Sequence, residues 1–153
     1  MSEAAIAERM DAILTAHQGL EGPLLPILHA VQAEFGLIPA AAVAPIAKAL
    51  ALTGAEVEGV ISFYHDFRRT PAGRHTIKLC RAEACQAMGG DQALARIEAA
   101  LGLKLGESRA DVTLEAVYCL GLCACGPAAQ VDGQPIGRLD AAKVAAIAAE
   151  VLS

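Results

Sequence analysis

The fold of the second half of this chain is decided by two stretches, Ile77-Lys-Leu-Cys80-Arg-Ala-Glu-Ala-Cys85 and Leu114-Glu-Ala-Val-Tyr-Cys119-Leu-Gly-Leu-Cys123. Each begins in a segment that alternates polar and apolar residues, as a β-strand does, and then reaches a cysteine. We expect a strand over 75–79, with Ile77 and Leu79 on one face, and a helical pattern over 90–101. A second strand is expected over 112–118, and its alternation places Val112, Leu114, Ala116 and Tyr118 on one face. Two strands joined through a helix are normally parallel, so both cysteines should emerge at one edge of a sheet.

The residues after the second strand complete this layer. Residues 128–131 and 134–137 flank Asp132-Gly133, which predicts a tight hairpin turn. Asp140 can cap a last helix that turns Val144, Ile147 and Val151 inward. Strand, helix, strand, hairpin and helix in this order predict a small α/β domain with a mixed sheet over residues 71–153.

The first 70 residues carry only helical patterns and predict an N-terminal helical bundle. A second helix should start at Pro23 and end at Gly36, and a third should cover 41–50, although the interior Pro45 leaves its start open. Thr53 and Glu56 form a capping box before a fourth helix. The first helix carries apolar residues at helical spacing, namely Ile6, Met10, Ile13 and Leu14. The run 68–73, Arg-Arg-Thr-Pro-Ala-Gly, marks the boundary between the two domains.

Composition limits what the chain can do. Of its 153 residues 55% are hydrophobic, so a core can form, while the net charge of −5 argues against nucleic acid as the main partner. No apolar run is long enough for a membrane span, and the N-terminus lacks the features of a secretory signal. We therefore expect a cytoplasmic protein, in which thiols stay reduced. Five cysteines in that compartment indicate metal binding or redox chemistry.

Four of the cysteines should converge from two loops, although 33 residues separate Cys85 from Cys119. The loops Cys80–Cys85 and Cys119–Cys123 are wider than the Cys-x₂-Cys knuckles usual for zinc, which favours a [2Fe–2S] cluster. Neither loop holds the histidines of a Rieske centre, and the plant-type ferredoxin spacing is absent. Zinc and buried core thiols stay open as alternatives. Cys125 is interpreted as a small packed residue, although it could replace Cys123 as a ligand.

The remaining patterns point to electron transfer without a local active site. Neither a nucleotide-binding fingerprint nor a catalytic constellation occurs in the sequence. Gly121 and Gly126 give the backbone freedom to turn N–H groups toward the sulfurs. Arg81, next to a ligand, is a candidate for favouring the reduced, more negative cluster, whereas Arg68 and Arg69 fit a solvated linker that contacts a partner.

The spacing Cys-x₄-Cys, a long gap, and Cys-Leu-Gly-x-Cys with a proline four residues on resembles the thioredoxin-like [2Fe–2S] ferredoxin family. That family includes the small peripheral-arm subunit of NADH:quinone oxidoreductase and subunits of NAD-linked hydrogenases and formate dehydrogenases. The resemblance extends from about Leu24 onward and includes the segment Ile61-Ser-Phe-Tyr-His-Asp-Phe67. It implies a helical bundle before a thioredoxin-like α/β domain. It also implies one [2Fe–2S] cluster with Cys80, Cys85, Cys119 and Cys123 as cofactor and metal ligands.

Within the family, the segment Cys80-Arg-Ala-Glu-Ala-Cys85-Gln-Ala-Met-Gly is most similar to the gamma subunits of soluble NAD-dependent molybdenum formate dehydrogenases. That resemblance implies a flavin- and NADH-binding partner subunit and a larger iron–sulfur and molybdenum catalytic subunit. FMN and the molybdenum cofactor would belong to those partners. An equivalent subunit of NADH:quinone oxidoreductase or of an NAD-linked hydrogenase is the near alternative. A zinc-stabilised interaction module without redox activity is the alternative from another class.

Overall fold

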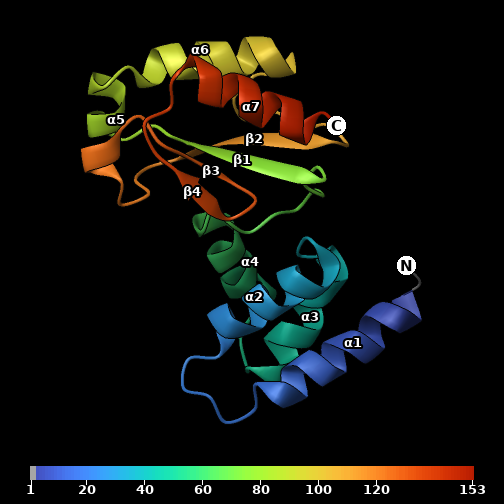
Figure 1. Cartoon of the computed structure of the whole chain (residues 1–153). Coiled ribbons are helices and arrows are strands. Elements are labelled where there is room, and N and C mark those ends of the chain that lie inside the picture. The colour runs from blue at the N-terminus through green and yellow to red at the C-terminus, as the bar shows by residue number, and fades with distance from the viewer. Residues whose placement is uncertain (1–2) are drawn as a thin grey trace. The chain divides into compact units, whose positions relative to one another are not determined.

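The computed structural model describes the backbone of residues 3–153 and the side chains from Ile6 onward. The chain forms two compact units, one that ends at Pro71 and one that begins at Ala72. Among the described residues, no helix is long and apolar enough to cross a membrane. The helices of the first unit, shown from blue to green in Figure 1, are α1 (Glu3–Ala16), α2 (Leu24–Phe35), α3 (Ala40–Ala49) and α4 (Gly54–Phe63).

The helix ends of the first unit follow the local signals in the sequence. α2 starts after Pro23 and stops at Gly36, whose φ of 74° suits a glycine and whose N–H donates to the Gln32 carbonyl at 2.8 Å. At α4, the N–H of Glu56 donates to Thr53 Oγ1 at 3.2 Å, and Glu56 Oε2 accepts the N–H of Thr53 at 2.7 Å. The predicted capping box is therefore confirmed. α3 begins one residue earlier than expected and keeps Pro45 inside.

One face of each helix in this unit is buried in a common apolar core. Burying one large aliphatic side chain contributes on the order of 2 kcal/mol. The predicted helical bundle is thus confirmed, with a core of its own. Its largest fully buried side chains are Met10, Ile27, Leu28, Val31, Ile38, Ile46 and Val57.

The linker arginines are engaged within this first unit. The N–H of Ile38 donates to the Arg68 carbonyl at 2.7 Å, and Arg69 donates from Nη1 to the Ile38 carbonyl at 3.1 Å. Arg69 also forms an ion pair with Glu58. The linker, expected to be solvated, is therefore attached to the first unit at Arg68 and Arg69 by hydrogen bonds and an ion pair.

The second unit is an α/β layer built on a four-stranded sheet of order β2-β1-β3-β4. β1 pairs with β2 in parallel and with β3 antiparallel, and β3 pairs antiparallel with β4, which confirms the predicted mixed sheet. Its strands are β1 (His75–Cys80), β2 (Val112–Val117), β3 (Ala129–Val131) and β4 (Gln134–Ile136). Its helical segments are α5 (Glu83–Ala87), α6 (Gly90–Leu101), the 3₁₀ turn η1 (Cys123–Cys125) and α7 (Ala141–Val151).

α6 and α7 lie side by side over the same face of this sheet (Figure 1). The core beneath them contains Ile77 and Leu79 of β1 and Val112 and Leu114 of β2, all four fully buried. The hairpin turn falls at Asp132 and Gly133, with φ values of 47° and 85°. Asp140 caps α7 by accepting the Lys143 N–H at 2.8 Å. The predicted hairpin and cap are therefore confirmed.

The second strand ends one residue earlier than expected, and the prediction for Tyr118 is wrong. β1 stops at Cys80, which pairs with Val117, so the parallel ladder offers no partner beyond that point. Tyr118 is 78% exposed, whereas Val112 and Leu114, with which the alternation grouped it, are fully buried. Cys80, conversely, is the last residue of its strand, not the first residue after it.

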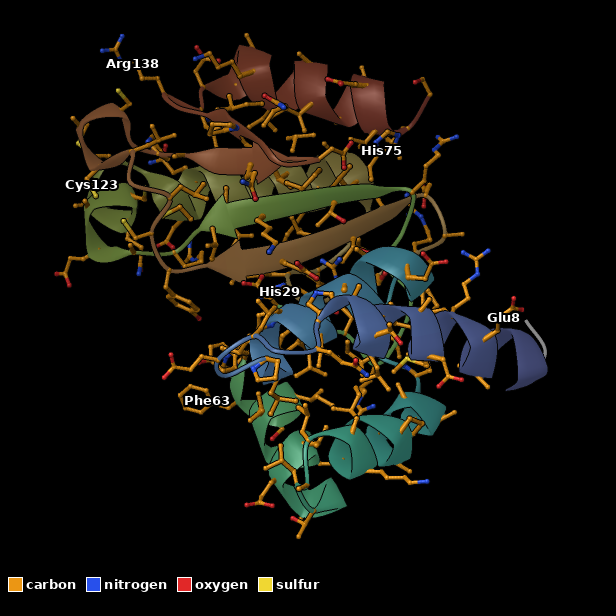
Figure 2. The ribbon with its side chains drawn as sticks, turned by 90° about the horizontal axis from the view of Figure 1, so that it is seen from below. Glu8, His29, Phe63, His75, Cys123 and Arg138 are labelled. Atoms are coloured by element: carbon orange, nitrogen blue, oxygen red, sulfur yellow. The ribbon has the colours of Figure 1, made fainter. Side chains whose placement is uncertain are left out.

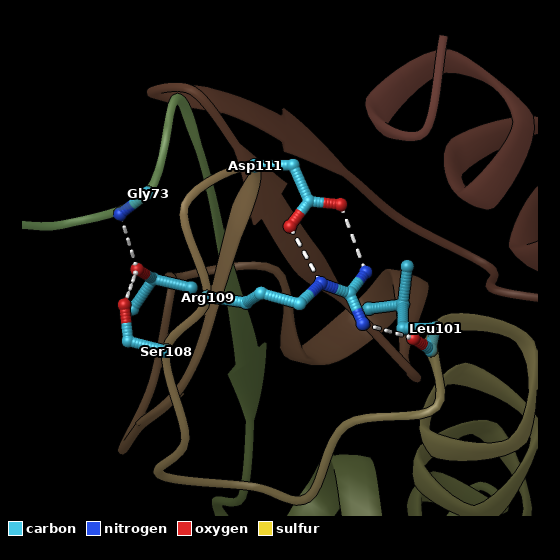
Figure 3. Close-up of polar contacts among 6 residues, drawn as sticks. Gly73, Leu101, Ser108, Arg109 and Asp111 are labelled. Atoms are coloured by element: carbon cyan, nitrogen blue, oxygen red, sulfur yellow. Dashed lines mark hydrogen bonds and ion pairs between the residues drawn. The ribbon is translucent and has the colours of Figure 1, made fainter.

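A cluster of polar side chains lies where β1 and β2 begin, at the end of the sheet away from Cys80 (Figure 3). Thr113, buried in β2, accepts the N–H of Gly73 at 2.7 Å and bonds the Ser108 hydroxyl at 2.6 Å. Arg109 donates to both carboxylate oxygens of Asp111, at 2.6 and 2.8 Å, and this pairing lowers the pKa of Asp111 to about 2. These bonds fix the loop that enters β2.

Candidate metal centre

The two parallel strands deliver their cysteines to one edge of the sheet. Cys80 is in register with Val117, and Cys119 follows two residues later. In Figure 2 the labelled Cys123 lies at one end of the sheet and His75, which begins β1, lies at the other. The predicted convergence of the two cysteine-bearing segments is therefore present in the fold.

Cys85 is held by α5, a short helix where the sequence predicts only a loop. Gln86 Nε2 donates to the Arg81 carbonyl at 2.7 Å and ties α5 to the residue after Cys80. Gly90, the first residue of α6, lies so close that a Cβ there would be 2.7 Å from the Cys85 carbonyl oxygen. Glycine at this position is therefore what lets α6 start against the turn that carries Cys85.

Cys119 and Cys123 form a second pair on the outside of the unit. Their sulfurs lie 3.7 Å apart, and the N–H of Gly121 donates to Cys119 Sγ at 3.3 Å, as expected from the glycine at that position. Cys119 has a φ of 113°, which is unfavourable for a residue with a Cβ. Such strain persists only where the surrounding structure imposes it, and it often marks a functional site.

Backbone N–H groups point at the buried thiol of Cys80. Burial opposes ionisation, but the N–H groups of Ala82, Leu120 and Cys119 and the thiol of Cys85 lower the pKa of Cys80 overall. Hydrogen bonds to the charged form of a group favour that form. The N–H groups around Cys80 therefore favour its thiolate form.

Neighbouring thiols raise the pKa of two further cysteines, Cys85 and Cys123. Burial first, and then the thiol of Cys80 and the charges of Cys80 and Cys123, raise the pKa of Cys85. The thiol and charge of Cys119, followed by burial and the charge of Cys80, raise the pKa of Cys123. The packing agrees, because Leu120 and Leu122 from the second loop pack against the buried cluster that contains Cys80 and Cys85.

The structure thus places the four predicted ligands in two neighbouring pairs. Cys80 and Cys85 are each 2% exposed, whereas Cys119 and Cys123 are exposed. Among the described residues, no group of three or more His, Cys, Asp or Glu side chains is placed to hold a single metal ion. Cys125 is partly buried, and the position of a Gly137 Cβ would lie 2.9 Å from its Cβ.

The donors of this edge suit an iron–sulfur cluster. Thiolates are soft ligands that select iron–sulfur clusters, zinc or Cu(I), and two thiolates on each of two irons is the arrangement of an all-cysteine [2Fe–2S] centre. Ala128 adds an N–H that lowers the pKa of Cys85, so N–H donors reach thiols of both pairs. Hydrogen bonds of this kind stabilise negative sulfur and adjust the reduction potential.

Sequence reasoning misses two features of this edge and the burial of a third. The strained backbone of Cys119 and the close approach at Gly90 depend on tertiary contacts, which leave no local signal. The third is the guanidinium of Arg81, whose Nη1 atom is buried and finds no hydrogen-bond partner among the described residues. In the sequence, its place next to Cys80 is the one signal that points to it.

Comparison with known proteins agrees with this geometry. The chain is 39% identical over 111 residues to a subunit of the NADH-quinone oxidoreductase of Mycobacterium bovis, an alignment of 71% of this chain and 44% of that protein. The chain thus spans less than half of that relative's length. It is 30% identical over 132 residues to the NADP-reducing hydrogenase subunit HndA of Solidesulfovibrio fructosivorans, covering 85% of this chain and 77% of HndA.

A solved structure and a family model extend the comparison. The crystal structure of an air-oxidised NAD⁺-reducing [NiFe]-hydrogenase matches with a TM-score of 0.73 and 30% identity, over 85% of this chain and 23% of the hydrogenase chain. Residues 10–152 match the model of the thioredoxin-like [2Fe-2S] ferredoxin family. The chain belongs to the thioredoxin-like [2Fe-2S] ferredoxin family and, with it, carries one [2Fe–2S] cluster.

Proposed function

We propose that Cys80, Cys85, Cys119 and Cys123 hold the cluster and that the chain passes single electrons within a multisubunit NAD-linked oxidoreductase. The observation that carries this proposal is the arrangement of four thiols as two pairs at one edge of the sheet. Cys80 and Cys85 form a buried pair, and Cys119 and Cys123 form an exposed pair. Each pair would supply the two thiolates of one iron.

The exposed pair supports exchange of electrons with another protein. A cluster held in part by surface cysteines has one edge near solvent, where a partner's redox group can approach it. Two large apolar side chains close to ligands in the sequence are exposed: Tyr118, next to Cys119, is 78% exposed, and Met88, three residues after Cys85, is 62% exposed. Exposed apolar side chains around a redox site are suited to burial against a partner chain.

The names of the relatives support the kind of complex. The matching proteins are a subunit of an NADH-quinone oxidoreductase and a subunit of an NADP-reducing hydrogenase, and the matching structure is an NAD⁺-reducing hydrogenase. All three are named for chemistry of a nicotinamide nucleotide. We infer that this chain exchanges electrons with a flavin in a partner subunit that binds NADH.

At a finer level, we propose a soluble NAD-dependent formate dehydrogenase as the complex. The support is the segment Cys80-Arg-Ala-Glu-Ala-Cys85-Gln-Ala-Met-Gly, which resembles the gamma subunits of such enzymes. A larger iron–sulfur and molybdenum subunit would then oxidise formate, and FMN would belong to the NADH-binding subunit. A quinone- or hydrogen-linked complex is the alternative that the names of the relatives favour.

The helical unit up to Pro71 is proposed to dock the subunit onto its partner. None of the five cysteines lies in it, so it adds no thiol ligand to the cluster. It does expose an aromatic edge, because Phe63 is 73% and Tyr64 is 43% exposed. Their rings lie 5.1 Å apart at the C-terminal end of α4.

Anaerobic purification followed by iron, sulfide and zinc analysis tests the centre itself. We expect two irons and two sulfides per chain and an S = 1/2 EPR signal only after reduction with dithionite. Stoichiometric zinc without iron, in protein made with ample iron, would instead support a zinc-stabilised interaction module. Colour gives the same answer quickly, because an iron–sulfur protein is reddish-brown and a zinc protein has no visible band.

The finer proposal is tested on the complex isolated through an affinity tag on this chain. A formate dehydrogenase would contain molybdenum and flavin, and formate would reduce the cluster seen by EPR. Nickel in the complex, with reduction by hydrogen, would identify a hydrogenase instead. Neither outcome changes the cluster analysis of the isolated chain, so the two levels of the proposal can be judged separately.

A further inference from the structure

Arg81 is a largely buried cation beside Cys80 and Cys85, the buried cysteine pair. Its side chain is 17% exposed and forms an ion pair from Nη2 to Asp91 Oδ1 at 2.7 Å. Its Nη1 atom is buried and has no hydrogen-bond partner among the described residues. A buried guanidinium that is only partly paired is costly, so it calls for a source of negative charge nearby.

The backbone of Arg81 places this cation at the cysteine edge. Arg81 directly follows Cys80, its N–H donates to the Val117 carbonyl at 2.7 Å, and its carbonyl accepts Gln86 Nε2 at 2.7 Å. The position of a Cβ on Gly90 lies 2.7 Å from the Cys85 carbonyl oxygen and 4.0 Å from Arg81 Nη1. The guanidinium therefore lies beside the turn that carries Cys85.

The charge around Arg81 is balanced poorly without the thiolates. Its ionic partner Asp91 has a side chain that is 73% exposed, so water and salt screen the charge of Asp91 far more than that of Arg81. The N-terminus of α6, which begins at Gly90, adds further partial positive charge. The interior of this edge therefore has a surplus of positive charge, which anionic sulfur at Cys80 and Cys85 can offset.

We propose that the positive charge of Arg81 raises the reduction potential of the cluster and that the negative charge of Asp91 opposes this effect. The inference rests on the proposed ligand set. Reduction adds one electron to a group that already carries negative charge, and a nearby cation stabilises the product more than the reactant. Removing the charge of Arg81 should therefore lower the potential, and removing the charge of Asp91 should raise it.

The test is an EPR-monitored redox titration of the purified protein and of four variants: Arg81→Gln, Arg81→Lys, Asp91→Asn and Arg109→Gln. At the wild-type midpoint potential, Arg81→Gln should lower the ratio of reduced to oxidised cluster by roughly threefold or more. Asp91→Asn should raise that ratio, and a tenfold change corresponds to about 59 mV for one electron. Arg81→Lys keeps the charge and should stay closer to wild type than Arg81→Gln.

Arg109→Gln is the matched control, because Arg109 is also ion-paired but lies where β1 and β2 begin, at the other end of the sheet. The reduction potential of the cluster in Arg109→Gln should equal that of the wild type. Equal potentials for Asp91→Asn, Arg81→Gln and wild type would overturn the inference. If Arg81→Gln does not assemble a cluster, the sign of the shift in Asp91→Asn decides, since that variant keeps Arg81. Absence of iron in the wild type would instead count against the proposed function.

Discussion

Cys80, the last residue of β1, lies opposite Val117, the last residue of β2, in the parallel ladder. Because the two strands end at the same level, Cys119 leaves the sheet only two residues beyond this pair. Cys85 and Cys123 then need only a short helix and a short turn to reach the same edge. One strand pairing thus brings together thiols that are far apart in the sequence.

The ligand assignment is tested by replacing each cysteine with alanine. By the proposed assignment, loss of Cys80, Cys85, Cys119 or Cys123 removes a thiolate that supplies both charge and a bond to iron, so cluster content should collapse. Cys125→Ala, the matched control, should cost at most about 1 kcal/mol and leave the EPR spectrum nearly unchanged. Iron analysis and EPR of the five variants measure this. A cluster lost in Cys125→Ala but kept in Cys123→Ala would shift the ligand set by two residues.

The close approach at Gly90 gives a second prediction. A methyl group in Gly90→Ala would meet the Cys85 carbonyl oxygen at 2.7 Å, so α5 and α6 must move apart, at a cost of about 1–3 kcal/mol. We expect a lower melting temperature together with reduced cluster content, because the displaced turn carries Cys85. Absorbance of the cluster and thermal unfolding give the two readouts.

Gly59→Ala is the control for that experiment. Gly59 also lies inside a helix, α4, but a Cβ there would have nothing within 4 Å. Alanine favours a helix over glycine by up to about 1 kcal/mol, so this variant should be as stable as the wild type or more so. A loss of cluster in both variants would show that the close contact at Gly90 is not the cause.

Much of the fold could be predicted because its signals are local. The Thr53–Glu56 box, the Asp132-Gly133 turn and the Asp140 cap each depend on side chains within a few residues, and all three formed as expected. Alternation in the first strand placed Ile77 and Leu79 on one face, and the structure buries both. In the second strand alternation failed at Tyr118, because the end of β2 is set by where its neighbour β1 stops.

The finer features of the site could not be predicted in this way. The positive φ of Cys119 and the helix around Cys85 arise because two loops must share one edge of the sheet. The burial of Arg81 depends on α6, which begins nine residues further along the chain. The sequence could identify the cysteines by type and spacing, whereas the arrangement around them required the tertiary structure.

The ion pair of Arg109 and Asp111 predicts a dependence of stability on pH. The pKa of Asp111 is lowered from 3.8 to about 2 because the carboxylate accepts two hydrogen bonds from Arg109. A lowered pKa in the folded state stabilises the protein above pH 3.8, and this contribution is lost as the pH falls toward 2. Asp111→Asn should therefore melt at a lower temperature than the wild type near neutral pH.

The difference in melting temperature between the two proteins should shrink as the pH falls through that interval, because protonation removes the charge from the wild-type carboxyl as well. Circular dichroism at a series of pH values measures it. Carbon NMR of the Asp111 carboxyl gives its titration midpoint directly. A midpoint near pH 3.8 would show that Arg109 does not lower the pKa of the Asp111 carboxyl in solution.

Docking by the helical unit is tested first by deletion. A chain that begins near Pro71 keeps the whole α/β unit, with its own buried core and all five cysteines. We expect it to retain the visible spectrum of the cluster but to bind the proposed flavin-bearing partner more weakly than the full chain does. Equal affinity of the two, measured by calorimetry, would place the docking surface in the α/β unit.

Phe63 provides a sharper test in the full-length chain. Its ring is 73% exposed at the end of α4 and meets Tyr64 edge-on, while Tyr64 in turn contacts Phe67, so the aromatic edge is held in place before any partner arrives. Exposed aromatic side chains that are already ordered contribute strongly to binding, and truncating one in the centre of an interface typically costs about 2 kcal/mol or more. Phe63→Ala should therefore weaken binding to the flavin-bearing subunit by roughly tenfold or more, with no change in cluster content.

Leu20→Ala is the control, because it removes another apolar side chain of the same unit that is 49% exposed, and it should leave the affinity unchanged. Equal affinities for both variants and the wild type would show that the aromatic edge of α4 lies outside the interface.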